Sequence, residues 1–140
     1  GGQVEDLAAE KNGADIETLR GMYLKKTSCL LSAGAVCGSI LAGANEEELK
    51  YAAEYAEKLG LAFQIIDDIL DCTSDEKTLG KPIGSDEKNG KTTYVTLLGI
   101  DGAKAEAERL SGEALTALCK IKGDNAALRE LTADLLDRKF

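Results

Sequence analysis

Apolar residues recur along the chain every three or four positions, which is the spacing of amphipathic α-helices. The pattern predicts two long helices and three shorter ones, over residues 15–42, 45–72, 93–98, 101–121 and 124–139. Asp15 is a suitable N-cap for the first of them, and Gly43 is a suitable C-cap. Serine, glycine, lysine and the only proline accumulate between residues 73 and 92, so we expect a loop there.

The strongest helix start lies at Asn45, which is followed by three glutamates. An N-cap residue with a glutamate three positions later forms a capping box, and acidic side chains favour the positive end of a helix. The composition agrees with helices. The hydrophobic fraction is 44% and only 4% of the residues are aromatic, so Leu, Ile, Val and Ala must build the core. We therefore predict an all-α fold.

The segment from Thr27 to Asn45 contains no charged residue and is nearly long enough to cross a bilayer. Three serines and three glycines dilute its apolar residues, and no aromatic residues flank it as an interfacial belt would. These features favour a buried helix, whose small residues permit close packing, over a membrane span.

The overall charge and the missing residue types exclude several classes of function. A formal charge of -8 disfavours nucleic acid and anionic membranes as partners. The chain contains no histidine, which removes Ser–His and Cys–His nucleophiles and histidine-ligated metals. Its four cysteines form no C-x-x-C pair, so we expect reduced thiols and a cytoplasmic location.

The helix predicted over residues 45–72 carries a polar stripe on an otherwise apolar surface. At about 100° per residue, one narrow arc holds an amide and three carboxylates, which are Gln64, Asp67, Asp68 and Asp71. Neighbouring buried carboxylates repel one another, and no Lys or Arg accompanies them on this helix face. Mg²⁺ relieves such repulsion and uses one or two carboxylates while it bridges to phosphates. The stripe therefore predicts a Mg²⁺ site, with a solvated acidic face as the alternative.

Cations would have to meet such phosphates, and several lysines precede or follow the aspartates: Lys25, Lys26, Lys81, Lys88 and Lys91. Lys26 is the most informative, because it borders the uncharged segment and Thr27 beside it offers a hydroxyl. The alternative for each lysine is a solvated surface charge. Gly84–Thr92 reads G-x5-G-K-T, which is one residue longer than a P-loop and follows a helix instead of a strand, so a nucleotide-binding loop is disfavoured.

Several motifs, taken in their order and spacing, resemble one protein family. They are Phe63–Asp71 (F-Q-x-x-D-D-x-x-D), Leu79–Lys81, Gly84–Asp86 and Gly90–Tyr94, with Gly1–Gln3, Asp6 and Lys26–Thr27 upstream. These motifs are similar to the second aspartate-rich region and other pocket elements of the trans-isoprenyl diphosphate synthases, or polyprenyl synthetases. The resemblance covers nearly the whole chain and is nearest to bacterial geranyltranstransferase, also called farnesyl diphosphate synthase.

The resemblance implies an isoprenoid synthase-like helical bundle around a central cavity. Residues 1–140 would form the C-terminal part of this single domain, and the first aspartate motif would lie upstream of Gly1. The family works as a homodimer that condenses isopentenyl diphosphate with dimethylallyl or geranyl diphosphate to give farnesyl diphosphate, with Mg²⁺ or Mn²⁺ as cofactor. Metal and cations would stabilise the leaving diphosphate, and the isopentenyl double bond would attack the allylic cation. The departing diphosphate would accept the proton that is then lost, so no side-chain base would be needed.

The resemblance also assigns roles to individual residues. Asp67 would ligate the metal directly, and Asp68 and Asp71 would act directly or through bound water. Three lysines would bind the allylic diphosphate, namely Lys26, Lys81 and Lys91. The residues implied in catalysis are Lys26, Thr27 and Gln64. Thr27 and Gln64 would present oxygen dipoles to the cation. Further pocket residues implied by the family are Gln3, Asp6, Phe63, Asp86, Arg138 and Lys139.

Three other interpretations compete with a farnesyl synthase. A non-catalytic subunit or paralogue would keep the fold without turnover, although the intact carboxylates and lysines favour an enzyme. A longer-chain synthase, making geranylgeranyl or polyprenyl diphosphate, would differ in residues upstream of this chain. A plain helical interaction protein fits the composition but not the ordered motifs. We expect the 140-residue chain to be inactive alone and to expose apolar helix faces.

Overall fold

The structure, a computed structural model, describes residues 15–73 and 91–137. These residues form helices joined by turns, and no strand occurs among them. The elements are α2 (Ile16–Tyr23), η1 (Leu24–Ser28), α3 (Cys29–Leu41), α4 (Glu46–Thr73), α7 (Tyr94–Leu118) and α8 (Ala126–Leu136). The predicted all-α fold is confirmed.

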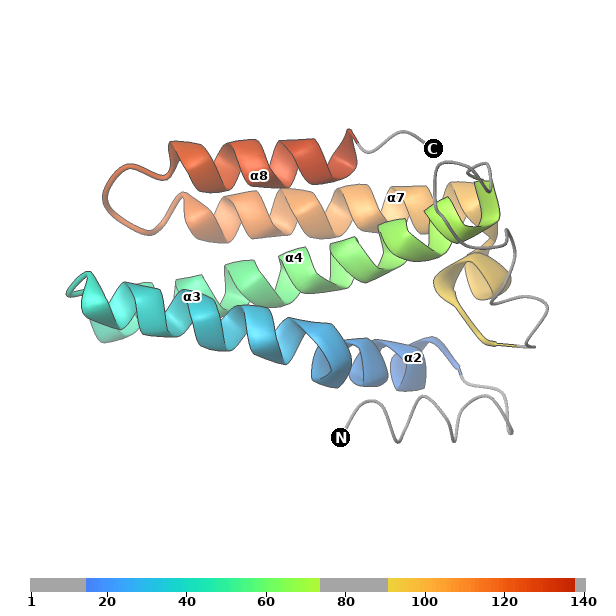
Figure 1. Cartoon of the computed structure of the whole chain (residues 1–140), viewed down its shortest axis with the longest axis horizontal. Helices are drawn as coiled ribbons and strands as arrows, with labels where there is room; N and C mark the ends of the chain where they lie inside the picture. Colours follow the sequence, from blue (N-terminus) through green and yellow to red (C-terminus); the bar gives the residue numbers. More distant parts are fainter. Residues whose placement is uncertain (1–14, 74–90, 138–140) are drawn as a thin grey trace.

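Helix α4 is the centre of the bundle (Figure 1). It runs between α2 and α3 on one side and α7 and α8 on the other, and it contacts each of them as well as η1. At 28 residues it is also the longest helix in the described part of the chain. A helix with neighbours on two sides buries most of its circumference, so α4 can carry apolar residues around most of its surface.

The helix predicted over residues 15–42 is present, but a π-helical turn interrupts it. Asp15 caps its start by accepting a hydrogen bond from the Thr18 backbone N–H at 2.8 Å. Gly43 follows its end in the left-handed region, with φ of 80°. The π turn, η1, spans Leu24–Ser28 and was not predicted from the sequence. Short π-helical insertions of this kind are rare and frequently occur at functional sites.

Helix α4 begins at the capping box that the sequence predicts. The Asn45 Oδ1 atom accepts hydrogen bonds from the backbone N–H groups of Glu47 and Glu48, both at 3.0 Å. The Glu48 carboxylate accepts in return from the Asn45 backbone N–H at 3.0 Å, and this bond holds the pKa of Glu48 below its ordinary value. The start of the aspartate helix is therefore fixed by local contacts.

Helix α7 contains the break that the sequence predicts between two helical segments. Gly99 has φ of 72° and ψ of 170°, a conformation that residues with a side chain rarely adopt. The start of α7 is capped by Thr93, whose hydroxyl accepts from the Thr96 backbone N–H at 3.2 Å. Helix α8 is joined to α4 by Tyr55, whose hydroxyl lies 3.1 Å from the Thr132 hydroxyl.

Two apolar clusters build the core on either half of α4. The cluster around its second half contains Leu19, Met22, Tyr23, Leu61, Ala62, Ile65, Ile66, Ile69, Leu70, Tyr94, Ala103, Ala107 and Leu110. The cluster around its first half contains Tyr55, Ala56, Leu59, Ala114, Ala117 and Leu118. The first cluster draws on α2, α4 and α7 together, so it fixes the position of the part of α4 that carries the aspartates.

Helix α3 is far more exposed than the sequence suggests. None of its residues is buried, and Leu30 and Leu41 are 78% and 89% exposed. The prediction of a buried helix over residues 27–45 is therefore wrong for this chain, because α3 packs on α4 along one side and its opposite side is uncovered among the described residues. The described helices include none that is both long and apolar enough to cross a membrane.

Candidate active site

The predicted polar stripe lies on the second half of α4, and its members are buried to different degrees. Asp68 and Asp71 are only 2% and 1% exposed, Gln64 is also buried, and Asp67 is half-buried. The helix positions beside them are filled by fully buried apolar residues: Leu61, Ala62, Ile65, Ile66 and Ile69. Carboxylates in such surroundings need donors or cations to stabilise their charge.

Asp68 is bonded to two other helices. Its Oδ2 atom accepts a hydrogen bond from the Tyr23 hydroxyl at 2.7 Å and a longer one from the Tyr94 backbone N–H at 3.3 Å. Tyr94 is the first residue of α7, so this carboxylate meets the positive end of that helix. Two donors and a helix dipole therefore stabilise a negative charge that water hardly reaches.

The two tyrosines around Asp68 also pack on each other. The ring centroids of Tyr23 and Tyr94 lie 5.7 Å apart, with the planes tilted by 41°. Burial raises the pKa of Tyr94 to about 12, with smaller contributions from nearby carboxylates, so its ring stays neutral at physiological pH. The surroundings of Asp68 are thus a buried junction between α2, α4 and α7.

The π turn brings the predicted catalytic pair together. The Thr27 hydroxyl donates a hydrogen bond to the Gln64 Oε1 atom at 3.1 Å, across 37 residues of sequence. Thr27 lies in η1 and Gln64 lies on the stripe of α4. Close approach of the two helices is possible because Gly60 has no side chain: a Cβ atom there would lie 2.8 Å from the Ser28 Cα atom.

Two of the predicted phosphate-binding lysines lie close in sequence to the tyrosines of this junction. Lys26 lies in η1, three residues after Tyr23, and Lys91 lies three residues before Tyr94. Both tyrosines bond Asp68, so the backbone of each lysine lies within three residues of a contact to this carboxylate. Lys26 and Lys91 are half-buried. A bound phosphate would require positive charge of this kind near the acidic stripe.

The donor set of the stripe suits a hard divalent cation. Asp67 makes no hydrogen bond or ion pair with another described residue, and it is half-exposed, so its oxygens can bind a ligand. Residues 15–73 and 91–137 contain no group of three acidic or thiol side chains that could hold a metal unaided. Mg²⁺ does not require one, because it usually keeps several waters and takes one or two carboxylates plus substrate phosphates. Asp67 with a diphosphate therefore fits Mg²⁺.

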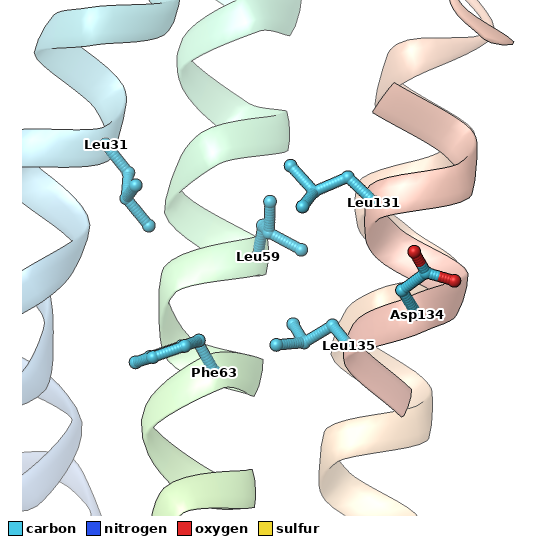
Figure 2. A pocket seen from close by; sticks show the side chains of 6 residues that line it. All are labelled: Leu31, Leu59, Phe63, Leu131, Asp134 and Leu135. Atoms are coloured by element: carbon cyan, nitrogen blue, oxygen red, sulfur yellow. The ribbon is translucent and has the colours of Figure 1, made fainter. Parts of the chain in front are cut away.

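An apolar groove with a volume of about 370 Å³ lies between α3, α4 and α8 (Figure 2). Its lining residues are Leu31, Leu59, Phe63, Leu131, Asp134 and Leu135. Phe63 is the exposed exception on the apolar arc of α4, and its side chain points toward α3. It precedes Asp67 by four residues, so the two lie one turn apart on neighbouring positions of α4. The acidic stripe and the groove are therefore adjacent.

Several predicted site residues lie outside the described residues: Gln3, Asp6, Lys81, Asp86, Arg138 and Lys139. Among the described ones, the structure brings together Thr27 with Gln64 and joins Asp68 to two tyrosines. Sequence reasoning missed Tyr23 altogether and gave Tyr94 no role. A signal for Tyr23 existed, because it precedes Thr27 by four residues and therefore shares a helix face with it.

Comparison with known proteins identifies relatives over most of the chain. A family model described as polyprenyl synthetase matches residues 1–131. Geranylgeranyl pyrophosphate synthase 11 of Arabidopsis thaliana is 43% identical over 129 residues, which are 90% of this chain and 36% of that protein. The heptaprenyl diphosphate synthase structure from Staphylococcus aureus matches with a TM-score of 0.93 and 25% identity, over 99% of this chain and 56% of that one.

A further solved structure, the Helicobacter pylori geranyltransferase complexed with magnesium and isoprenyl diphosphate, matches with a TM-score of 0.78 and 34% identity. That match covers 97% of this chain and 45% of the other. Several other curated relatives are named as geranylgeranyl synthases. Since the relatives are named for different chain lengths, the farnesyl type stays a prediction.

The curated relatives are much longer than the chain, which spans 36–40% of the first of them. The likeness nevertheless extends across nearly all of the 140 residues and includes both the sequence and the three-dimensional arrangement of the helices. The chain belongs to the polyprenyl synthetase family.

Proposed function

We propose that the chain forms the allylic diphosphate side of an isoprenyl diphosphate synthase and acts as the C-terminal part of a longer single-domain enzyme. One observation carries the proposal: a buried acidic stripe and an apolar groove adjoin on α4, with Asp67 and Phe63 one turn apart. An isoprenyl diphosphate has the matching two-part chemistry, because a polyanionic head continues into a hydrocarbon chain. The groove volume of about 370 Å³ lies in the range of small-ligand pockets.

The polar residues bind and orient the head group. Asp67 would hold Mg²⁺, with Mn²⁺ as a substitute, and Asp68 and Asp71 would support it from the same stripe. The metal, when bound, supplies positive charge that stabilises the leaving diphosphate. Lys26 and Lys91 would donate hydrogen bonds to phosphate oxygens. The half-buried position of both lysines supports this role, since a partly desolvated cation is screened less than a surface one.

The remaining residues would act on the hydrocarbon part. Gln64 Oε1 is oriented by the Thr27 hydroxyl at 3.1 Å, so both dipoles are fixed before substrate arrives. They would stabilise the cation that forms when the allylic carbon–oxygen bond breaks. Leu31, Leu59 and Phe63 offer apolar walls that exclude water, which would otherwise trap that cation. Isopentenyl diphosphate would be held by residues outside this chain, in a homodimeric enzyme.

Two products are candidates. The motifs resemble those of farnesyl diphosphate synthases, so we propose farnesyl diphosphate from geranyl and isopentenyl diphosphates. Geranylgeranyl diphosphate is the second candidate, and it is favoured by curated relatives of that name at 42–45% identity. Mass spectrometry of the products made by the longer enzyme from dimethylallyl and isopentenyl diphosphates distinguishes them. A dominant C20 product would replace the farnesyl proposal with the geranylgeranyl one.

Asp67→Ala tests the site. In the longer enzyme we expect a fall in kcat of at least about 10²-fold, equivalent to roughly 3 kcal/mol of transition-state stabilisation. Asp101→Ala is the matched control, because Asp101 is an exposed carboxylate on α7, and its turnover should stay within about twofold of the parent. Near-normal turnover of Asp67→Ala would defeat the site assignment.

A non-catalytic subunit remains the alternative from a different class. It predicts that the longer protein, purified with Mg²⁺ and both substrates, makes no prenyl diphosphate. The synthase proposal predicts condensation by the longer protein and none by the 140-residue chain alone, because the isopentenyl diphosphate site would lie outside this chain. Condensation by the isolated chain would contradict the division of the enzyme that we propose.

A further inference from the structure

Two hydrogen bonds form a ladder between the π turn region and α4. The Tyr23 hydroxyl donates to Asp68 at 2.7 Å, and the Thr27 hydroxyl donates to Gln64 at 3.1 Å. Tyr23 and Thr27 are four residues apart, as are Gln64 and Asp68. Both rungs therefore lie on the facing sides of two antiparallel segments, one turn apart. Lys26 lies between the two donors in the sequence, so the two hydrogen bonds fix the position of its backbone relative to the acidic stripe.

The hydrogen bond from Tyr23 distinguishes two neighbouring carboxylates, Asp67 and Asp68. Asp68 receives the Tyr23 hydroxyl and the α7 N-terminus on one oxygen, whereas Asp67 makes no hydrogen bond or ion pair within the described part of the chain. Tyr23 is 0% exposed, so no water competes for its hydroxyl. A buried carboxylate with donors already in place has little to gain from a metal. Asp67 is half-buried and has no such donor among the described residues, so its oxygens are accessible to a metal.

We propose that Tyr23 is a positioning residue that gives Asp67 and Asp68 different roles. Its hydroxyl holds Asp68 by a hydrogen bond within the protein, and Asp67 remains available to bind the metal. With Thr27 and Gln64, Tyr23 also fixes the position of the Lys26 backbone relative to Asp67, the two residues that would bind one diphosphate in the proposed function. The inference rests on the proposed function, because it concerns how that diphosphate site is built. It assigns Asp68 a structural part within the motif and gives Tyr23 a role.

Tyr23→Phe tests the proposal because it removes only the hydroxyl. The measurement is the affinity of the full 140-residue chain for Mn²⁺ with inorganic pyrophosphate, followed by the EPR signal of free Mn²⁺. We expect binding to weaken by about 10-fold or more, the usual effect of losing a group that orients a metal site. In the longer enzyme, the KM for the allylic diphosphate should rise more than kcat falls, because ground-state binding of the head group is loosened.

Tyr55→Phe is the matched control. Tyr55 is also buried on the bundle side of α4, and its hydroxyl lies 3.1 Å from the Leu128 carbonyl and the Thr132 hydroxyl of α8. Losing that bond should lower the unfolding temperature about as much as Tyr23→Phe does, yet leave Mn²⁺ affinity unchanged. If both variants weaken Mn²⁺ binding equally, or if Tyr23→Phe leaves it unchanged or tightens it, Tyr23 is not a positioning residue.

Asp68→Asn supplies a second variant, since the amide keeps an acceptor oxygen for Tyr23. If Tyr23 acts through Asp68, the double variant Tyr23→Phe with Asp68→Asn should bind Mn²⁺ no more weakly than the worse single one. Fully additive losses would overturn the proposal. Absence of saturable Mn²⁺ and pyrophosphate binding by the unaltered chain would instead refute the proposed function itself, which separates the two failures.

Discussion

Helices α3 and α4 reverse the usual relation between hydrophobicity and burial. α3 has no charged residue and no buried one, whereas α4 carries several carboxylates and buries two of them almost completely. The difference lies in their neighbours: α4 runs between two layers, and α3 is covered on one side by α4. Burial in this chain is therefore decided by position in the bundle, and polar groups in the centre are retained because specific donors meet them.

The comparison also separates two uses of small residues. Gly60 on α4 lies so close to Ser28 that a Cβ atom would approach its Oγ atom to 2.6 Å. Gly34 and Gly38 on α3 have no atom within 4 Å of such a Cβ position. Of the small residues predicted to permit close packing, Ser28 at one end of the uncharged segment thus does so against Gly60, whereas Gly34 and Gly38 have no contact partner along the middle of α3.

The largest expected effect comes from truncating a buried side chain of α4. Leu61→Ala should destabilise the chain by about 2–5 kcal/mol, because Leu61 is fully buried in the cluster beside the aspartates. Leu41→Ala on exposed α3 should change stability by less than about 0.5 kcal/mol. Urea unfolding followed by circular dichroism measures both. Similar losses for the two variants would mean that α3 is covered in solution and would remove the contrast.

Adding one methyl group to each helix should give effects of opposite sign. Gly60→Ala should cost about 1–3 kcal/mol, because the Ser28 backbone has no room to yield. Gly34→Ala should gain up to about 1 kcal/mol, because alanine restricts the unfolded chain and meets nothing in the folded one. Thermal unfolding midpoints of the two variants check the signs. A stable Gly60→Ala variant would show that η1 and α4 are not in close contact.

The smallest effect concerns a charge pair at the edge of the central helix. Lys58 on α4 lies 2.7 Å from Glu113 on α7, and both side chains keep contact with solvent. Lys58→Met should therefore cost less than about 1 kcal/mol at pH 7. The hydrogen bond from Lys58 holds the pKa of Glu113 below its ordinary value of 4.5. The ion pair therefore stabilises the fold above that pH and loses its effect as the pH falls through the lowered pKa. The free energies of unfolding of the parent chain and of Lys58→Met should converge as the pH falls from 7 to 3. A difference that stays constant over this range would exclude the ion pair as its cause.

Much of the fold follows from contacts between residues close in the chain. The Asn45 capping box, the Asp15 cap and the break at Gly99 are each visible in a few successive residues, and each is present in the structure. The polar stripe of α4 is equally local, because residues four positions apart share a helix face. Helical periodicity puts Phe63 beside the polar stripe, but its exposure and its groove depend on α3 and α8.

The sequence by itself determined where the helices begin and end, that three carboxylates and Gln64 share one face, and that the chain resembles the family whose membership is now shown. Tertiary structure alone decided that α3 is exposed, that a π turn carries Lys26 and Thr27, and that Asp68, unlike Asp67, is hydrogen-bonded to other residues in the part of the chain that the structure describes. The physical reason is distance along the chain. Periodicity and capping act within about four residues, whereas Tyr23 reaches Asp68 across 45 residues, a pairing that no local pattern encodes.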